Sequence, residues 1–171
     1  NNPDKSITNN IIGTSNVVLT CMKYNVKLIY LSTDYVYPGI EGNYNEDYYL
    51  KPFTNYGWSK LGGECAVRLY DNHLILRMAM NKRPFPHPKA LVDMKKSLMY
   101  IDEASEVVLK LLDEKGTINV GGKSQSVYDF VKETNSDVGE IYLDDIDDVN
   151  MATDCSMDTT KMKRLLDDTI I

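Results

Sequence analysis

Two short apolar runs separated by a stretch of helical spacing constrain the fold of this chain more than any other feature. The runs, residues 26–31 and 74–78, have the nearly continuous apolar character of strands that are covered on both faces of a parallel sheet. Between them, apolar residues recur at three- to four-residue spacing over residues 56–70, which predicts a helix. Because parallel strands need such a crossover, the order strand–helix–strand predicts an α/β fold.

Patterns on both sides of this unit predict further elements. Helical spacing precedes the first strand, and a helix that Asp102 could cap is predicted to end at Gly116. Ser126 and Asp129 have capping-box spacing at the start of another helix. The remaining predicted elements are helices over 5–24 and 159–166, a strand over 117–120 and a small strand over 141–143.

The composition excludes several classes of protein. The chain has 171 residues, 43% of them hydrophobic, and a net charge of −6, which disfavours binding to nucleic acid or to an anionic membrane surface. No apolar run is long enough to span a membrane, and the first residues do not resemble a secretory signal. The three cysteines lack the spacing of a disulfide framework or a metal site, so we expect reduced thiols, a cytoplasmic protein and no bound metal.

Hydroxyl groups are predicted to meet at one edge of the sheet. Ser32 and Thr33 end the first strand, where open α/β sheets bind their ligands, and a long aromatic loop over residues 34–55 follows, which we expect to be functional. Tyr56 and Lys60 then lie one helical turn apart on a common face. With 12 tyrosines in the chain, about one Tyr-x-x-x-Lys pair is expected by chance, and we interpret the second pair, Tyr128 and Lys132, as that chance occurrence.

This group of side chains suits proton transfer at a carbonyl. A phenol has a pKa of about 10, and a neighbouring ammonium favours the phenolate, so we expect Lys60 to lower the pKa of Tyr56 into a range useful for acid–base catalysis. Thr33 could hold a substrate carbonyl or hydroxyl against the phenol. On spacing alone, Tyr56 could equally be a helix-start aromatic and Lys60 a surface residue.

Longer strings around these residues resemble a known superfamily. Leu31–Gly39 (LSTDYVYPG) and Asn55–Glu64 (NYGWSKLGGE) closely resemble the extended short-chain dehydrogenase/reductases, and most of all the dTDP-4-dehydrorhamnose reductases and related nucleotide-sugar reductases. Further segments are similar in family order across nearly the whole chain: Asn10–Thr14, Tyr100–Asp102, Ile118–Gly122 and Asp154–Lys161.

The resemblance implies a role for each matching residue. Tyr56 would be the catalytic acid, Lys60 its partner and a ligand of the nicotinamide ribose, and Thr33 the third catalytic residue. Asn10 would support a proton relay, and Ser32 would contribute to the cofactor site. Asp34 and Tyr35 would lie beside the nicotinamide and the sugar.

The implied function is NADPH- or NADH-dependent reduction of a 4-keto-6-deoxy nucleotide sugar. A nucleotide-sugar epimerase remains an alternative, since epimerases use the same Thr, Tyr and Lys. A second alternative is a non-catalytic binding subunit like the beta subunit of methionine adenosyltransferase, which resembles these reductases. Dehydratases of the superfamily carry a Glu where this chain has Tyr35, which argues against dehydration.

Two features depart from the family pattern. None of the ten glycines forms the family's glycine-rich diphosphate fingerprint, so we expect an excerpt of a longer protein or a chain completed by a partner, such as a second copy. The strand over 26–31 would then expose an apolar edge. The second departure is the basic, proline-rich segment 82–89, in which Arg83 could bind a substrate diphosphate or simply lie in solvent.

The predicted architecture is therefore α/β, the C-terminal portion of a Rossmann-type doubly wound parallel sheet with a small C-terminal substrate-binding part. Residues 1–80 would form the second half of the nucleotide-binding domain and carry the catalytic motif. Residues 81–171 would be mostly substrate-binding, with the strand over 117–122 returning to the sheet.

Overall fold

A parallel sheet of three strands forms the centre of the computed structural model, which describes residues 2–146 and 151–167. The strand order is β1-β2-β7, so the middle strand pairs on both sides. Thr33 pairs with Met78 in register, and Met78 pairs with Val120, so all three strands have their carboxyl ends at one edge. The predicted α/β fold is confirmed. The strands are β1 (Leu28–Thr33), β2 (His73–Met78) and β7 (Gly116–Val120).

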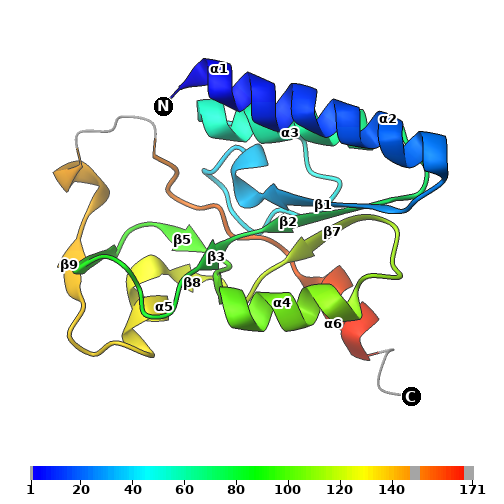
Figure 1. Cartoon of the computed structure of the whole chain (residues 1–171). Coiled ribbons are helices and arrows are strands. Elements are labelled where there is room, and N and C mark those ends of the chain that lie inside the picture. Colours follow the sequence, from blue (N-terminus) through cyan, green and yellow to red (C-terminus); the bar gives the residue numbers. More distant parts are fainter. Residues whose placement is uncertain (1, 147–150, 168–171) are drawn as a thin grey trace.

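Helices cover both faces of this sheet (Figure 1). The N-terminal helical segments and α3 lie on one face, and α4 and α6 lie on the other. This arrangement is the doubly wound form that was predicted. The helices are α1 (Pro3–Ser6), η1 (Ile7–Gly13), α2 (Thr14–Tyr24), α3 (Asn55–Val67), α4 (Ile101–Lys110) and α6 (Thr160–Asp167).

The alternation of β2 side chains builds a separate core on each face. Ile75 packs with Val18 of α2 and Val67 of α3, all of them buried. Leu74 and Leu76 point the other way and pack in a cluster with Ala104 of α4 and Met162 of α6. Because successive residues of a strand face opposite sides, one short apolar strand anchors helices on both faces of the sheet.

The N-terminal helix differs from the prediction in its middle. The single helix expected over 5–24 is continuous, but its segment η1 (Ile7–Gly13) is a π-helix. Asn10, from the family-like string, lies inside this widened turn. Such turns are rare and are frequently found at functional sites.

The start of α4 also differs from the prediction. The helix begins at Ile101 with Tyr100 as its N-cap, two residues before the expected cap Asp102. The Glu103 side chain accepts a hydrogen bond from the Tyr100 backbone N–H at 3.2 Å, and this contact places the cap at Tyr100. Asp102 instead lies in the first turn, where its charge favours the helix dipole.

The aromatic loop after β1 is largely a packing element rather than an open binding loop. Tyr37 and Tyr44 are fully buried with stacked rings, and they form a cluster with Val36 and Met157. The loop begins with the short 3-10 helix η2 (Asp34–Val36), which follows Thr33 directly. Only the residues around η2 reach the carboxyl edge of the sheet as part of the cavity described below.

Short strand pairs and a small helix lie beyond the main sheet. The pairs are β3 with β6, β4 with β9 and β5 with β8. Ser126 caps α5 as predicted, since its hydroxyl accepts from the Asp129 backbone N–H at 2.9 Å. β7 lies beside β2 in the main sheet; the division of the chain at residue 80 stays a prediction. The elements are β3 (Met80–Asn81), β4 (Lys89–Leu91), β5 (Lys95–Lys96), β6 (Met99–Tyr100), β8 (Gln125–Ser126), α5 (Val127–Lys132), β9 (Gly139–Ile141) and η3 (Leu143–Asp145).

Across residues 2–146 and 151–167, none of the helices has both the length and the apolar character that crossing a membrane would require.

Candidate active site

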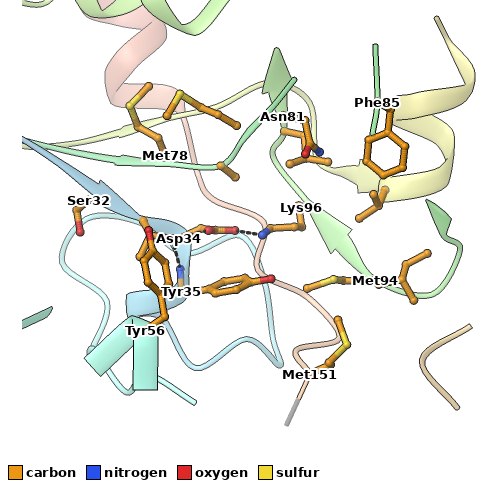
Figure 2. A pocket seen from close by; sticks show the side chains of 16 residues that line it. Ser32, Asp34, Tyr35, Tyr56, Met78, Asn81, Phe85, Met94, Lys96 and Met151 are labelled. Carbon is orange, nitrogen blue, oxygen red and sulfur yellow. Dashed lines mark hydrogen bonds and ion pairs between the residues drawn. The ribbon is translucent and has the colours of Figure 1, made fainter. Parts of the chain in front are cut away.

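A cavity of about 370 Å³ opens where β1 and β2 end. Figure 2 shows Asp34 from η2, Tyr56 from α3 and Lys96 from β5 around it, so three separate segments contribute polar groups. This is the edge at which parallel sheets of this kind bind ligands. Most of the other lining is apolar and includes the methionines Met78, Met80, Met94 and Met151.

Thr33 is held by two hydrogen bonds at the end of β1. Its hydroxyl donates to Asp34 Oδ1 at 3.0 Å and accepts from the Tyr35 backbone N–H at 3.2 Å. It also lies close enough to the Tyr56 phenol to favour the phenolate and so lower the pKa of Tyr56. The predicted meeting of the Thr33 and Tyr56 hydroxyls is therefore present in the structure.

The first turn of α3 brings Tyr56 to this position. Thr54 caps the helix by accepting from the Gly57 backbone N–H at 3.0 Å. A Cβ atom on Gly57 would lie 2.3 Å from the Tyr35 carbonyl oxygen, so a glycine is required for α3 to approach η2 this closely. Tyr56 itself keeps 45% of its surface exposed and lines the cavity.

The pKa of Tyr56 is raised above its ordinary value, contrary to the prediction. Burial of the phenol raises the pKa, and the Asp34 carboxylate raises it further. The Thr33 hydroxyl and the positive charge of Lys96 lower it, but they do not outweigh the first two effects. At neutral pH the phenol therefore carries its proton.

Lys60 does not supply the positive charge that was expected beside Tyr56. Its Nζ donates to the Leu31 carbonyl oxygen at 2.7 Å and lies 4.2 Å from the centre of the Tyr30 ring. Burial lowers the pKa of Lys60, although Glu64 partly opposes this effect. In the Tyr128–Lys132 pair, by contrast, the ammonium contacts the phenol oxygen at 2.5 Å on the surface. A direct contact between the two side chains is therefore no guide to which pair is functional.

Asn10 lies behind the first turn of α3 and is not among the residues that line the cavity. Its Nδ2 donates to the Ser59 hydroxyl at 2.9 Å, and that hydroxyl donates to the Tyr56 carbonyl oxygen at 2.8 Å. The side chain of Asn10 is thus linked to the backbone of Tyr56, and its role in a proton relay stays a prediction.

Ser32 offers a polar atom suited to a bound cofactor. Its side chain is buried and lines the cavity, and its hydroxyl oxygen has no hydrogen-bond partner among the residues that the structure describes. A buried hydroxyl without a partner costs free energy unless a ligand supplies the missing hydrogen bond. The position fits the predicted contribution of Ser32 to a cofactor site.

The matches with known proteins agree with this geometry. Residues 1–81 match the model of the RmlD substrate binding domain family. This stretch is somewhat less than half of the chain. Over 70 residues the chain is also 41% identical to a dTDP-4-dehydrorhamnose reductase of Streptomyces griseus, an alignment that covers 39% of this chain and 23% of the relative. The resemblance to the nucleotide-sugar reductases of the extended short-chain dehydrogenase/reductase superfamily is thereby confirmed.

Two further matches extend the comparison. Over 67 residues it is 36% identical to methionine adenosyltransferase 2 subunit beta of Bos taurus, covering 39% of this chain and 20% of the relative. A dTDP-4-dehydrorhamnose reductase from Bacillus anthracis in complex with NADP has the same fold, with a TM-score of 0.79 and 22% identity over 91% of this chain and 65% of that one. The alignments thus cover less than a quarter of the length of these two curated relatives and about two thirds of the length of the solved structure.

Arg83 is not among the residues that line the cavity. Its guanidinium pairs with Glu103 at 2.6 Å and stacks over the Tyr100 ring at 4.0 Å, which holds it at the start of α4. Phe85 of the same basic segment does line the cavity. A diphosphate would have to compete with Glu103 for Arg83, and the substrate contact of Arg83 stays a prediction.

Lys96 is a component of the site that the sequence did not reveal. Its Nζ lies 2.9 Å from Asp34 Oδ2 and 4.0 Å from the centre of the Tyr35 ring. Asp34 and Tyr35, which the resemblance placed beside substrate and nicotinamide, do line the cavity. Lys96 belongs to a two-residue strand without any motif, so only the path of the chain through residues 79–100 brings it to this place.

Proposed function

We propose that this chain takes part in the NAD(P)-dependent reduction of a 4-keto-6-deoxy nucleotide sugar. The observation that supports this most directly is that Thr33 and Tyr56 line the same cavity at the carboxyl edge of a parallel sheet, where Thr33 acts on the phenol. The sequence match to a dTDP-4-dehydrorhamnose reductase suggests the substrate class. The apolar, methionine-rich lining suits a deoxy sugar, whose methyl group needs no hydrogen-bond partner.

Tyr56 is the proton donor in this proposal. A nicotinamide cofactor, when bound, supplies the hydride that reduces the carbonyl carbon. The Tyr56 hydroxyl gives its proton to the carbonyl oxygen, which becomes the hydroxyl of the product. Because its pKa is raised, the phenol carries this proton at neutral pH, and the Thr33 hydroxyl fixes the direction of the phenol oxygen.

Ser32, Lys60 and Tyr56 are the residues proposed to hold the cofactor, either NADPH or NADH. The unpartnered hydroxyl of Ser32 is available for a new hydrogen bond. Lys60 would have to leave the Leu31 carbonyl or share its remaining N–H groups with a ribose.

The protonation of Tyr56 also bears on the epimerase alternative. An epimerase must first remove a proton from a substrate hydroxyl, for which the phenolate is needed. Burial and Asp34 disfavour the phenolate, so the site favours reduction.

The match to methionine adenosyltransferase 2 subunit beta supports a second candidate, a non-catalytic subunit of such an enzyme. In that case the RmlD-type fold would serve as a binding partner. Co-sedimentation with a methionine adenosyltransferase catalytic subunit would support this function, and turnover of a nucleotide sugar by the chain would support the first one.

The direct test of the reductase proposal is the oxidation of NADPH or NADH with a dTDP-4-keto-6-deoxy sugar, followed at 340 nm. The variants are Tyr56→Phe and, as a matched control, Tyr128→Phe from the second Tyr-x-x-x-Lys pair. We expect turnover by the unmodified chain, a loss of about 10²- to 10⁴-fold in Tyr56→Phe and no loss in Tyr128→Phe. Equal turnover in the unmodified chain and Tyr56→Phe, or no turnover with either cofactor, would contradict the proposal.

A further inference from the structure

Lys96 and Asp34 form a buried ion pair at the centre of the cavity, and no catalytic motif includes Lys96. Only 12% of the Lys96 side chain and 2% of the Asp34 side chain are exposed. Figure 2 shows the pair bridging η2 and β5, with the Tyr35 ring below the ammonium. Isolated buried charges are costly, so each of these groups depends on the other.

The Asp34 carboxylate connects Lys96 to the proton of Thr33. One carboxylate oxygen, Oδ2, contacts Lys96, and the other, Oδ1, accepts the hydrogen bond from the Thr33 hydroxyl at 3.0 Å. A hydroxyl has a single proton. Thr33 gives that proton to Asp34, so Lys96, Asp34 and Thr33 form one connected chain of polar contacts in the lining that they share with Tyr56.

We propose that Lys96 is a positioning residue of this site, which holds the Asp34 carboxylate against the Thr33 hydroxyl beside Tyr56. The proposal rests on the proposed function, because it assigns Lys96 to the proton-donating machinery of that reaction. Lys96 acts through Asp34 and Thr33, and its ammonium also balances the negative charge that Asp34 presents to Tyr56.

The charges around Tyr56 give this arrangement a measurable consequence. The titratable groups that act on the phenol from the surrounding elements are Asp34, Tyr35, Lys96 and Tyr30. Burial works to lower the pKa of Lys96, but Asp34 outweighs it and the pKa is raised, so the ammonium stays charged. Removing this charge leaves Asp34 unbalanced, and an unbalanced carboxylate disfavours the Tyr56 phenolate.

The test measures the pKa of Tyr56 by the ¹³Cζ resonance of labelled tyrosine, assigned with Tyr56→Phe. This titration needs neither cofactor nor substrate, so its result is independent of whether the chain turns over a nucleotide sugar. The variants are Lys96→Met, which fits the methionine-rich cavity, Lys96→Arg, which keeps the charge, and the double variant Asp34→Asn with Lys96→Met, which removes both charges.

We expect Lys96→Met to raise the pKa of Tyr56 by about one unit or more, Lys96→Arg to leave it near the original value, and the double variant to bring it back to or below that value. A merely structural role for Lys96 would not make the pKa of Tyr56 rise in Lys96→Met and fall back in the double variant. An unchanged pKa in folded Lys96→Met would overturn the proposal.

Should Lys96→Met fail to fold, Asp34→Asn alone decides the matter, because it leaves an unbalanced cation and should lower the pKa of Tyr56. An unchanged or raised value in Asp34→Asn would equally overturn the proposal.

Discussion

Arg77 of β2 is the largest fully buried side chain among the described residues, and its partners explain how a charge can lie there. Its guanidinium forms two hydrogen bonds with the Glu64 carboxylate of α3, at 3.0 and 2.9 Å, and a third with the Tyr37 hydroxyl at 2.8 Å. Neither side chain of the ion pair is exposed to solvent. Since Glu64 follows Lys60 by one helical turn, this pair fixes the rotation of α3 and with it the direction of the helix face that carries Tyr56 and Lys60.

We predict that Arg77→Met lowers the free energy of unfolding by about 3–5 kcal/mol, because it removes the buried partner of the Glu64 carboxylate and leaves the half-exposed guanidinium of Arg68, 3.8 Å away, as its counter-charge. The measurement is urea unfolding followed by circular dichroism. Arg83→Met is the control, since its ion pair with Glu103 is half exposed and should contribute less than about 1 kcal/mol. Similar losses of stability in the two variants would show that the buried Arg77–Glu64 pair contributes no more than the half-exposed Arg83–Glu103 pair.

The raised pKa of Tyr56 predicts the pH dependence of the proposed reduction. A general acid works in its protonated form, so kcat/KM should be constant through neutral pH and fall only above the ordinary phenol pKa of about 10. The check is a pH profile of kcat/KM between pH 6 and 11. A fall that begins near pH 7 to 8 would mean that Lys60 lowers the pKa of Tyr56 after all, as the motif suggested.

At the scale of elements, the contact between α3 and η2 decides whether the site forms. Gly57 lies against the Tyr35 carbonyl, whereas Gly62, on the same helix, lies against the Ile11 side chain. Backbone atoms cannot move aside as a flexible side chain can. The two glycines of one helix therefore differ in their tolerance of a methyl group.

We predict that Gly57→Ala costs about 1–3 kcal/mol of stability and separates Tyr56 from Thr33, because the new Cβ would lie 2.3 Å from the Tyr35 oxygen. Gly62→Ala should cost less, since only the Ile11 side chain must move. Thermal unfolding measures the loss of stability, and the Tyr56 ¹³Cζ chemical shift reports the separation of Tyr56 from Thr33. An unchanged Tyr56 resonance in Gly57→Ala would refute this explanation of the close approach.

The elements differ in how far the sequence could predict them. Apolar runs predicted β1 and β2 to within two residues, because burial on both faces leaves a clear pattern. The motif placed Tyr56 beside Thr33 correctly. The pKa direction of Tyr56 was wrong because burial and Asp34, which spacing does not reveal, outweigh any nearby cation. Lys96 was missed because two-residue strands such as β5 have no periodicity.

At the scale of the whole molecule, β1 forms one margin of the three-stranded sheet. It pairs with β2 on one side, and no other strand of residues 2–146 and 151–167 pairs with it. Leu31, near the end of this strand, is 46% exposed, and Val26 just before it is 54% exposed. The Lys60 ammonium contacts the Leu31 carbonyl oxygen, but the exposed Leu31 and Val26 side chains are apolar, and an apolar edge strand tends to pair with another chain.

We therefore predict that the chain, tested as it stands, self-associates through β1, and that Leu31→Lys weakens the association because a charge on an edge strand opposes pairing. Sedimentation velocity over a concentration series measures the effect. Leu69→Lys is the matched control: Leu69 is exposed to 78% but lies outside the strands, so the same change there should leave the association unchanged. Equal weakening by both variants would indicate general charge repulsion. A monomer at every concentration would contradict the prediction and show that β1 does not pair with a second chain.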